Sequence, residues 1–127
     1  MTKIWQKNYD PGVPATIDVN EFRSIGEILD FSIRKFANRP AFHCMGTTMT
    51  FAQIDQASRR FASYLQHQLG MKKGDRIAIM MPNVMAYPVV MFAVLRGGYT
   101  VVNVNPLYTP RELEHQLNDS GAKALVV

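Results

Sequence analysis

The chain has 127 residues, a length that suits one domain, and 47% of them are apolar, which is enough for a hydrophobic core. Its net charge of +4 is modest, and its basic residues are spread along the chain instead of forming the dense stripe of a nucleic-acid-binding protein. A single cysteine, Cys44, excludes an internal disulfide. Because no apolar leader follows Met1 either, we expect a reducing, cytoplasmic location. The spread of the basic residues makes a nucleic-acid partner unexpected.

Residues 1–22 show no sustained hydrophobic period and are predicted to form an extended N-terminal arm. Pro11, Gly12 and Pro14 favour an extended or turning backbone in this arm. Trp5 and Tyr9 indicate that the arm packs against something. Residues 23–127 carry the periodic patterns and are predicted to form a separate α/β unit.

The first helix is predicted to begin at Ser24, because Glu27 follows at the spacing of a capping box. It ends before Pro40, since the residue that precedes a proline disfavours helix. Its apolar residues recur at helical spacing and would form one buried stripe: Ile25, Ile28, Leu29, Ile33 and Phe36.

A small hairpin follows, with strands at 41–45 and 49–51 around the turn 46–48. Thr50 and Gln53 repeat the capping-box spacing and predict a second helix. Gly70 is a candidate C-cap for it. Its buried face is expected to consist of Phe51, Ile54, Phe61, Leu65 and Leu69.

From residue 76 the pattern alternates between strand and helix. We predict strands at 76–81, 100–104 and 122–127, and helices at 84–96, capped by Asn83 and ended by Gly97 and Gly98, and at 109–120. Thr109 and Gly121 would cap the last helix at its two ends, with Pro110 at its first position and Glu112 closing a capping box. Such alternation implies right-handed crossovers and a parallel sheet.

The last predicted strand is entirely apolar in its final residues, as is typical of strands in the middle of a parallel sheet, covered on both faces. We therefore expect residues 23–127 to be an incomplete α/β subdomain.

The uncharged run at 77–95 has about the length of a membrane span. Pro82, Asn83 and Pro88 interrupt it, so a buried strand followed by a helix is the better interpretation.

A search for a self-contained catalytic site finds none. The sequence has no glycine-rich phosphate loop, no nucleophile elbow and no histidine pair at metal-ligand spacing. His43 and Cys44 lie on a predicted strand and point to opposite faces, and we interpret them as core residues. His67 is expected to be solvated, and His115 to belong to a polar surface cluster near Glu112.

Asn103 and Asn105 follow an apolar strand at its C-terminal end, where open α/β sheets bind ligands. The interpretation we favour is that both satisfy backbone groups in the turn before Pro106. A group of methionines could line an acyl pocket, although methionines at such positions more often fill the core: Met80, Met81, Met85 and Met91.

Three segments resemble the adenylate-forming enzyme family: Met81-Pro82-Asn83, the helix end 94–98 and the strand and turn 101–106. The segment Leu107 to Ala122 and the arm segment Tyr9 to Pro14 look most like bacterial long-chain fatty acid:CoA ligases. The resemblance covers nearly the whole chain in order. It implies the N-terminal portion of the family's large domain, with a small hairpin and the start of a parallel sheet flanked by helices.

The resemblance implies a two-step ligase in the parent protein. ATP would activate a long-chain fatty acid to an acyl adenylate, Mg would neutralise the triphosphate, and the thiol of CoA would take the acyl group. The remainder of its own enzyme is the expected partner, with homodimer formation and peripheral association with the inner membrane as further expectations.

The family's phosphate loop, aromatic-Gly-x-Thr-Glu segment, ribose-binding Asp and C-terminal lysine all come later in its sequences and are absent here. The resemblance therefore transfers no catalytic, cofactor-binding or metal-binding residue to this chain, and we expect the chain alone to be inactive. What matches is scaffold that shapes turns and caps: Pro82, Asn83, Gly97, Asn105, Pro106, Thr109, Pro110, Glu112 and Gly121.

Two alternatives remain open at this point. One is another adenylate-forming ligase, acting on an aromatic, short-chain or amino acid. The other is a stand-alone binding module that dimerises through its exposed last strand, because unpaired strand edges and uncovered apolar faces associate readily.

Overall fold

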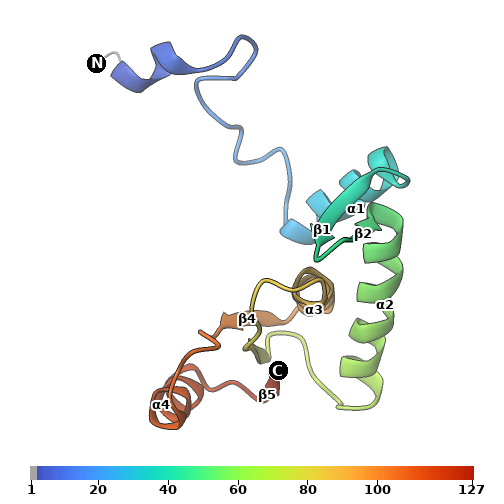
Figure 1. The fold of residues 1–127 in the computed structure, drawn as a ribbon, viewed down its shortest axis with the longest axis vertical. Helices are drawn as coiled ribbons and strands as arrows, with labels where there is room; N and C mark the ends of the chain where they lie inside the picture. Colours follow the sequence, from blue (N-terminus) through green and yellow to red (C-terminus); the bar gives the residue numbers. More distant parts are fainter. Residues whose placement is uncertain (1–2) are drawn as a thin grey trace.

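The structure is a computed structural model that describes residues 3–127. A short 3-10 helix at Ile4–Asn8 lies in the N-terminal arm, which reaches away from the rest of the chain (Figure 1). The remaining elements are α1 (Ile25–Phe36), β1 (Pro40–Cys44), β2 (Thr47–Thr50), α2 (Phe51–His67), β3 (Arg76–Ile79), α3 (Ala86–Arg96), β4 (Thr100–Asn103), α4 (Pro110–Ser120) and β5 (Ala124–Val126).

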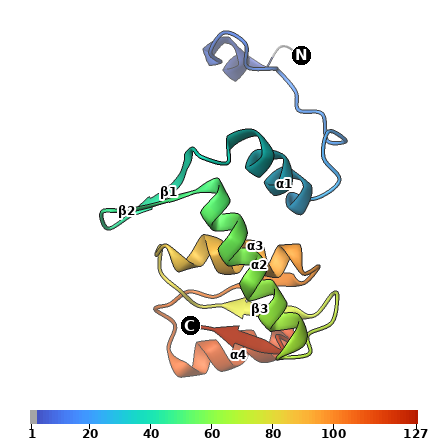
Figure 2. The ribbon, with the colours of Figure 1, turned by 90° about the vertical axis from the view of Figure 1, so that its right-hand side faces the viewer.

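Three parallel strands form the sheet in the order β4-β3-β5, as the alternating pattern predicts. The chain moves from β3 to β4 in one direction and from β4 past β3 to β5 in the other. Right-handed crossovers therefore place α3 and α4 on opposite faces of the sheet, and Figure 2 shows α3 above the sheet and α4 below it. Helix α2 packs along α3 and forms an outer layer on the same side.

The main core lies between the sheet and the layer formed by α2 and α3. It contains Leu65, Met71, Ile77, Ile79, Val90, Val94 and Tyr99. Strand β3 is the middle strand, and its Ile77 and Ala78 are 0% exposed. Within residues 3–127, β5 pairs with β3 alone and leaves Leu125 37% exposed. Strand β3 therefore holds the middle position among these three strands, and β5 lies at an edge of the sheet that the described residues form.

The hairpin turn is tighter than the sequence indicated. Cys44 pairs with Thr47, so Met45 and Gly46 alone form the loop, and both have positive φ angles of 48° and 77°. This is the backbone of a type I′ turn, which suits the twist of an antiparallel pair. The strands consequently end and begin within one or two residues of the predicted limits.

Helix α1 begins at the predicted cap, where the Ser24 hydroxyl accepts a hydrogen bond from the backbone N–H of Glu27 at 3.1 Å. The Glu27 carboxylate accepts from the N–H of Arg23 instead of Ser24, so only half of the capping box forms. The predicted buried stripe is wrong in part. Leu29 is the one buried residue of this fully described helix, and Ile25 and Ile28 are 53% and 43% exposed.

Helix α2 follows the prediction at its start, where the side chains of Thr50 and Gln53 complete a reciprocal capping box. Ile54 and Leu65 are buried as expected, whereas Leu69 lies beyond the helix end and is 48% exposed.

Helix α3 begins later than predicted, and Asn83 is not its cap. The N–H of Val84 donates to the carbonyl of Pro82 at 2.8 Å, and this turn takes the segment out of the helical path. The helix starts at Ala86 behind Met85, which makes no side-chain cap bond. Its end is as expected. A Cβ atom added to Gly97 would lie 2.2 Å from the ring of Tyr99, so only glycine allows this buried ring its place.

Helix α4 confirms the predicted signals at both ends. The Thr109 hydroxyl accepts from the N–H of Glu112, and the Glu112 carboxylate accepts from the N–H of Thr109 at 2.8 Å. Pro110 occupies the first turn, and Gly121 ends the helix in the left-handed conformation with φ of 63°.

The residues of the uncharged run 77–95 are divided mainly between β3 and α3. No helix within residues 3–127 combines the length and apolar character needed to cross a membrane.

The cap of α4 provides a test of this fold, because the helix buries none of its described side chains completely and depends on its ends. Substitution Thr109→Ala removes the hydroxyl of the capping box and is expected to lower the free energy of unfolding by about 1 kcal/mol. Urea denaturation followed by far-UV circular dichroism measures the loss. Thr109→Ser keeps the hydroxyl and should unfold close to the wild type, and an unchanged Thr109→Ala midpoint would show that the cap is not needed.

Candidate functional site

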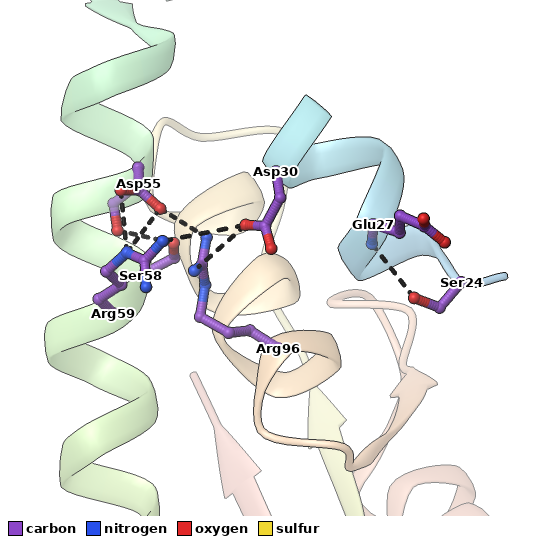
Figure 3. Close-up of polar contacts among 7 residues, drawn as sticks. All are labelled: Ser24, Glu27, Asp30, Asp55, Ser58, Arg59 and Arg96. Carbon is purple, nitrogen blue, oxygen red and sulfur yellow. Dashed lines mark hydrogen bonds and ion pairs between the residues drawn. The ribbon is translucent and has the colours of Figure 1, made fainter. Parts of the chain in front are cut away.

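Four charged side chains join α1, α2 and α3 at one point, which we call the ionic joint: Asp30, Asp55, Arg59 and Arg96 (Figure 3). Arg96, at the end of α3, donates from Nη2 to Oδ1 of Asp55 at 2.7 Å. Its Nη1 lies 3.6 Å from Oδ1 of Asp30 on α1. One guanidinium group thereby contacts carboxylates from two other helices.

Arg59 completes the joint from α2. Its Nε donates to both carboxylate oxygens of Asp55 at 2.9 Å, and its Nη2 lies 3.9 Å from Asp30. The hydrogen bond that Arg59 donates to Asp55 raises the pKa of Arg59 above its ordinary value. The fully buried Ser58 beside it donates its hydroxyl proton to the carbonyl of Asp55.

The arrangement of the ionic joint indicates a structural role and not a catalytic one. Two positive and two negative charges balance, and each guanidinium already contacts both carboxylates. The Arg96 side chain is only 16% exposed, so the joint lies partly away from water. Such a cluster fixes the relative positions of the three helices and leaves no charged group free for a substrate.

The carboxyl ends of β3 and β4 form the second polar region, where the sequence singled out two asparagines. The side-chain oxygen of Asn103 accepts a 2.6 Å hydrogen bond from the hydroxyl of Tyr87 on α3. The backbone carbonyl of Asn103 accepts from Nε2 of Gln116 on α4 at 2.9 Å. Asn103 thus connects helices on the two faces of the sheet, and the prediction that its side chain serves only backbone groups is wrong.

Asn105 behaves as the favoured interpretation predicts. Its side-chain oxygen accepts from the backbone N–H of Leu107 at 3.0 Å, which forms an Asx turn around Pro106. The side chain is therefore engaged in shaping the loop that leads to α4.

An apolar pocket of about 280 Å³ lies between β1 and the start of α3. Met85 and Met91 line it, whereas Met81 packs against the main core and Met80 belongs to neither lining nor core cluster. The methionines therefore do not form one pocket. The full lining is Phe42, His43, Cys44, Asn83, Val84, Met85, Tyr87, Pro88 and Met91.

The histidines and the cysteine lie at or near the surface. His43 is exposed and its Nδ1 is 2.7 Å from the hydroxyl of Thr48, so the interpretation of His43 as a core residue is wrong. Cys44 is half-buried, and its thiol donates to the carbonyl of Asn83 at 3.6 Å. His67 and His115 are exposed, as expected.

The described part of the chain does not fit a metal site. Within residues 3–127, no three His, Cys, Asp or Glu side chains come together in a way that could hold a metal ion. Asp55 is held in the ionic joint, and Asp75 is bonded to Lys123 at 2.6 Å.

Asp75 links the amino end of β3 to the segment that leads into β5. Its carboxylate accepts from Nζ of Lys123 at 2.6 Å and from the backbone N–H of Lys72 at 2.7 Å. These two hydrogen bonds lower the pKa of Asp75 below its ordinary value, and the bond from Lys123 has the larger effect.

Together, the hairpin, the parallel sheet covered by helices on both faces and the capped loops at its carboxyl edge define an α/β protein of the doubly wound type. A family model described as AMP-binding enzyme matches residues 29–127. The chain belongs to the AMP-binding enzyme family.

Curated relatives match the chain from end to end. It is 54% identical over 127 residues to the long-chain-fatty-acid–CoA ligase of Salmonella typhimurium. The aligned region covers 100% of this chain and 23% of that protein. It is 49% identical over the same span to the ligase of that name from Haemophilus influenzae, and 33% identical over 124 residues to that of Bacillus subtilis. The chain therefore spans less than a quarter of the length of these relatives and corresponds to their N-terminal part.

Solved structures confirm the expected fold class. The N-terminal subdomain of Klebsiella oxytoca NpsA, in complex with anthranilyl-AMSN, matches with a TM-score of 0.79 and 24% identity, over 87% of this chain and 28% of that one. A benzoate CoA ligase from Burkholderia xenovorans LB400 matches with a TM-score of 0.76 and 28% identity, over 82% of this chain and 21% of that one.

The lowered pKa of Asp75 predicts a specific pH dependence. A carboxylate with a depressed native pKa stabilises the fold above its unfolded-state pKa, and this contribution is lost as the pH falls through the native value. Asp75→Asn is therefore expected to be less stable than wild type at pH 7, and the difference should shrink between about pH 5 and pH 2. Urea midpoints across this range measure it.

Asp119→Asn is the control for that experiment, because Asp119 is an exposed carboxylate on α4 with no ion pair within the described chain. Its stability difference from wild type should stay small at every pH. An Asp75→Asn curve that runs parallel to the wild type throughout would contradict the role assigned to the Lys123 contact.

Proposed function

We propose that these 127 residues are the N-terminal part of the large domain of a long-chain fatty acid:CoA ligase. The parent enzyme would join a fatty acid carboxylate to ATP, giving an acyl adenylate and pyrophosphate, and then transfer the acyl group to the thiol of CoA with release of AMP. The observation that carries this proposal is the 54% identity, along the whole chain, to relatives with that name.

The identity pattern favours a long-chain fatty acid over an aromatic acid as substrate. The benzoate CoA ligase shares 28% of its aligned residues with this chain, about half the fraction shared with the Salmonella relative. The medium-chain acyl-CoA ligase of Rattus norvegicus lies between them at 35% over 106 residues. The long-chain ligases of Salmonella and Haemophilus therefore rank first, at 54% and 49%, whereas the Bacillus subtilis ligase of the same name, at 33%, is about as distant as the medium-chain ligase.

The role proposed for this chain within the enzyme is that of a scaffold. Residues 1–22 would be an arm and residues 23–127 an incomplete N-terminal subdomain, completed by the remainder of the polypeptide. ATP, Mg and CoA are implied for the parent, but no step of the reaction is assigned to a residue of this chain. We accordingly propose that the chain alone is inactive.

Isotope exchange between ATP and pyrophosphate tests the proposal. The 127-residue chain is expected to show no fatty-acid-dependent exchange. The reading frame is then followed beyond the codon for Val127, and the polypeptide of the relatives' length is expressed. That protein should exchange with long-chain fatty acids and not with benzoate, whereas exchange by the short chain, or a frame that stops at Val127, would refute the proposal.

We further propose that the parent is a cytoplasmic enzyme that associates peripherally with the inner membrane through its arm. Ile4, Trp5 and Tyr9 are 77%, 54% and 44% exposed, and the same short segment carries Lys3 and Lys7. Exposed aromatic and aliphatic side chains next to lysines suit the interface of an anionic bilayer. The same exposed residues could instead be covered by a second copy of the chain, which is the proposed homodimer.

The arm carries the only tryptophan of the chain, so fluorescence from Trp5 reports on the arm alone. Membrane association predicts a blue shift of its emission on addition of vesicles that contain anionic lipid, and a smaller shift for the Lys3→Gln/Lys7→Gln variant. Homodimer formation predicts a blue shift with rising protein concentration in the absence of vesicles. The wild type and the Lys3→Gln/Lys7→Gln variant should then show the same shift. An emission maximum that does not move in either titration would contradict both proposals.

A further inference from the structure

Helix α1 is attached to the rest of the chain by little apolar packing. Leu29 is its one buried residue, whereas Ile25, Ile28 and Phe31 are 53%, 43% and 41% exposed. A cavity of about 120 Å³ lies beneath the helix, between it, β1, α2 and α3. Side chains that line this open pocket have no protein atoms on that side, so their dispersion contacts with the rest of the chain are incomplete. Packing alone therefore holds α1 loosely.

The C-terminal end of α1 is tied to α2 by backbone bonds. The N–H of Ala52 donates to the carbonyl of Ala37 at 3.0 Å, and the N–H of Phe51 donates to the carbonyl of Arg39 at 3.2 Å. The rings of Phe36 and Phe51 also lie 6.0 Å apart. Residues 37–39 are thus a fixed point about which the helix could turn.

The body of α1 is held by charge. Within residues 3–127, both ion pairs that join α1 to another helix use Asp30, which lies 3.6 Å from Arg96 and 3.9 Å from Arg59. Asp30 is 46% exposed, so water and salt reach the contact. Arg96 is held independently by Asp55 at 2.7 Å and would stay in place if α1 moved away.

We propose that α1 is a hinged strap, closed onto α2 and α3 by the ionic joint, and that ionic strength controls its opening. With α1 turned away, Asp55 alone would face the two guanidinium groups of Arg59 and Arg96, which leaves one positive charge unbalanced. This charge attracts Asp30 back, and salt screens the attraction because the Debye length falls from about 14 Å at 0.05 M to about 4 Å at 0.5 M.

Opening of the strap would expose a specific surface and leave the main core intact. The walls of the cavity beneath α1 include Phe42, Ile54 and Phe92 as well as Leu29 itself. The core between α2, α3 and the sheet does not include any residue of α1. Residues 25–36 can therefore open as a local unit, at a lower free energy than global unfolding.

Hydrogen exchange measured by mass spectrometry on the 127-residue chain tests the strap. In 0.5 M NaCl the amides of 29–36 are expected to exchange about threefold faster than in 0.05 M NaCl, while those of α2 and α3 stay unchanged. Asp30→Asn should raise the exchange of the same amides about three- to fivefold in low salt and abolish their salt dependence.

Two control variants separate the ionic joint from other causes. Glu21→Gln makes the same change in net charge on the arm, outside the joint, and should match the wild type. Leu29→Ala removes the buried apolar contact and should speed exchange in α1 while keeping its salt dependence. The strap is ruled out if α1 exchange in the wild type is independent of salt, if Asp30→Asn matches Glu21→Gln, or if α1 and α2 always exchange together.

Discussion

The arrangement of the chain depends on the burial of β3. Ile77 and Ala78 are 0% exposed, so this short strand requires partners on both edges and cover on both faces. Strands β4 and β5 supply the edges, and α3 and α4 supply the faces. Buried backbone groups without hydrogen-bond partners are costly, so β3 needs a strand on each edge, and its apolar side chains need a helix on each face to exclude water. The pairing of Asp75 with Lys123 secures the same strand at its amino end.

The cover on one face creates a second requirement. Helix α3 buries Pro88, Val90, Ala93 and Val94, and it contacts α2 as well as strands β3 and β4. The end of α3 then carries Arg96, which reaches both α2 and α1. The position of α3 therefore depends on β3, the position of α2 depends on α3, and the ionic joint depends on both helices.

Sequence alone predicts the features that are set by nearby residues. The caps at Thr50 and Thr109 were predictable because donor and acceptor lie three positions apart and the helix geometry brings them together. Asn83 has the right residue type for a cap, but the turn made by Pro82 and Val84 removes it from the helix. The exposed stripe on α1 was not predictable, since periodicity identifies an apolar face without showing what covers it.

The polar sites follow the same division between local and distant contacts. The Asx turn of Asn105 involves a residue two positions away and was expected from the sequence. The pair Asp55 and Arg59 has helical i,i+4 spacing, which is a signal for an ion pair that the sequence itself carries. Arg96, in contrast, meets Asp55 across 41 positions, and only the packing of α2 on α3 brings them together.

A charged joint between three helices has a geometric consequence that an apolar contact lacks. Dispersion is not directional, whereas the hydrogen bond from Arg96 to Asp55 has a preferred direction and places the guanidinium group 3.6 Å from Asp30. Pairs of this kind add little stability when they are partly exposed. The contribution of Arg96 therefore lies in setting where α1 rests against α2 and α3, and with it the direction in which the chain enters the fold from the arm.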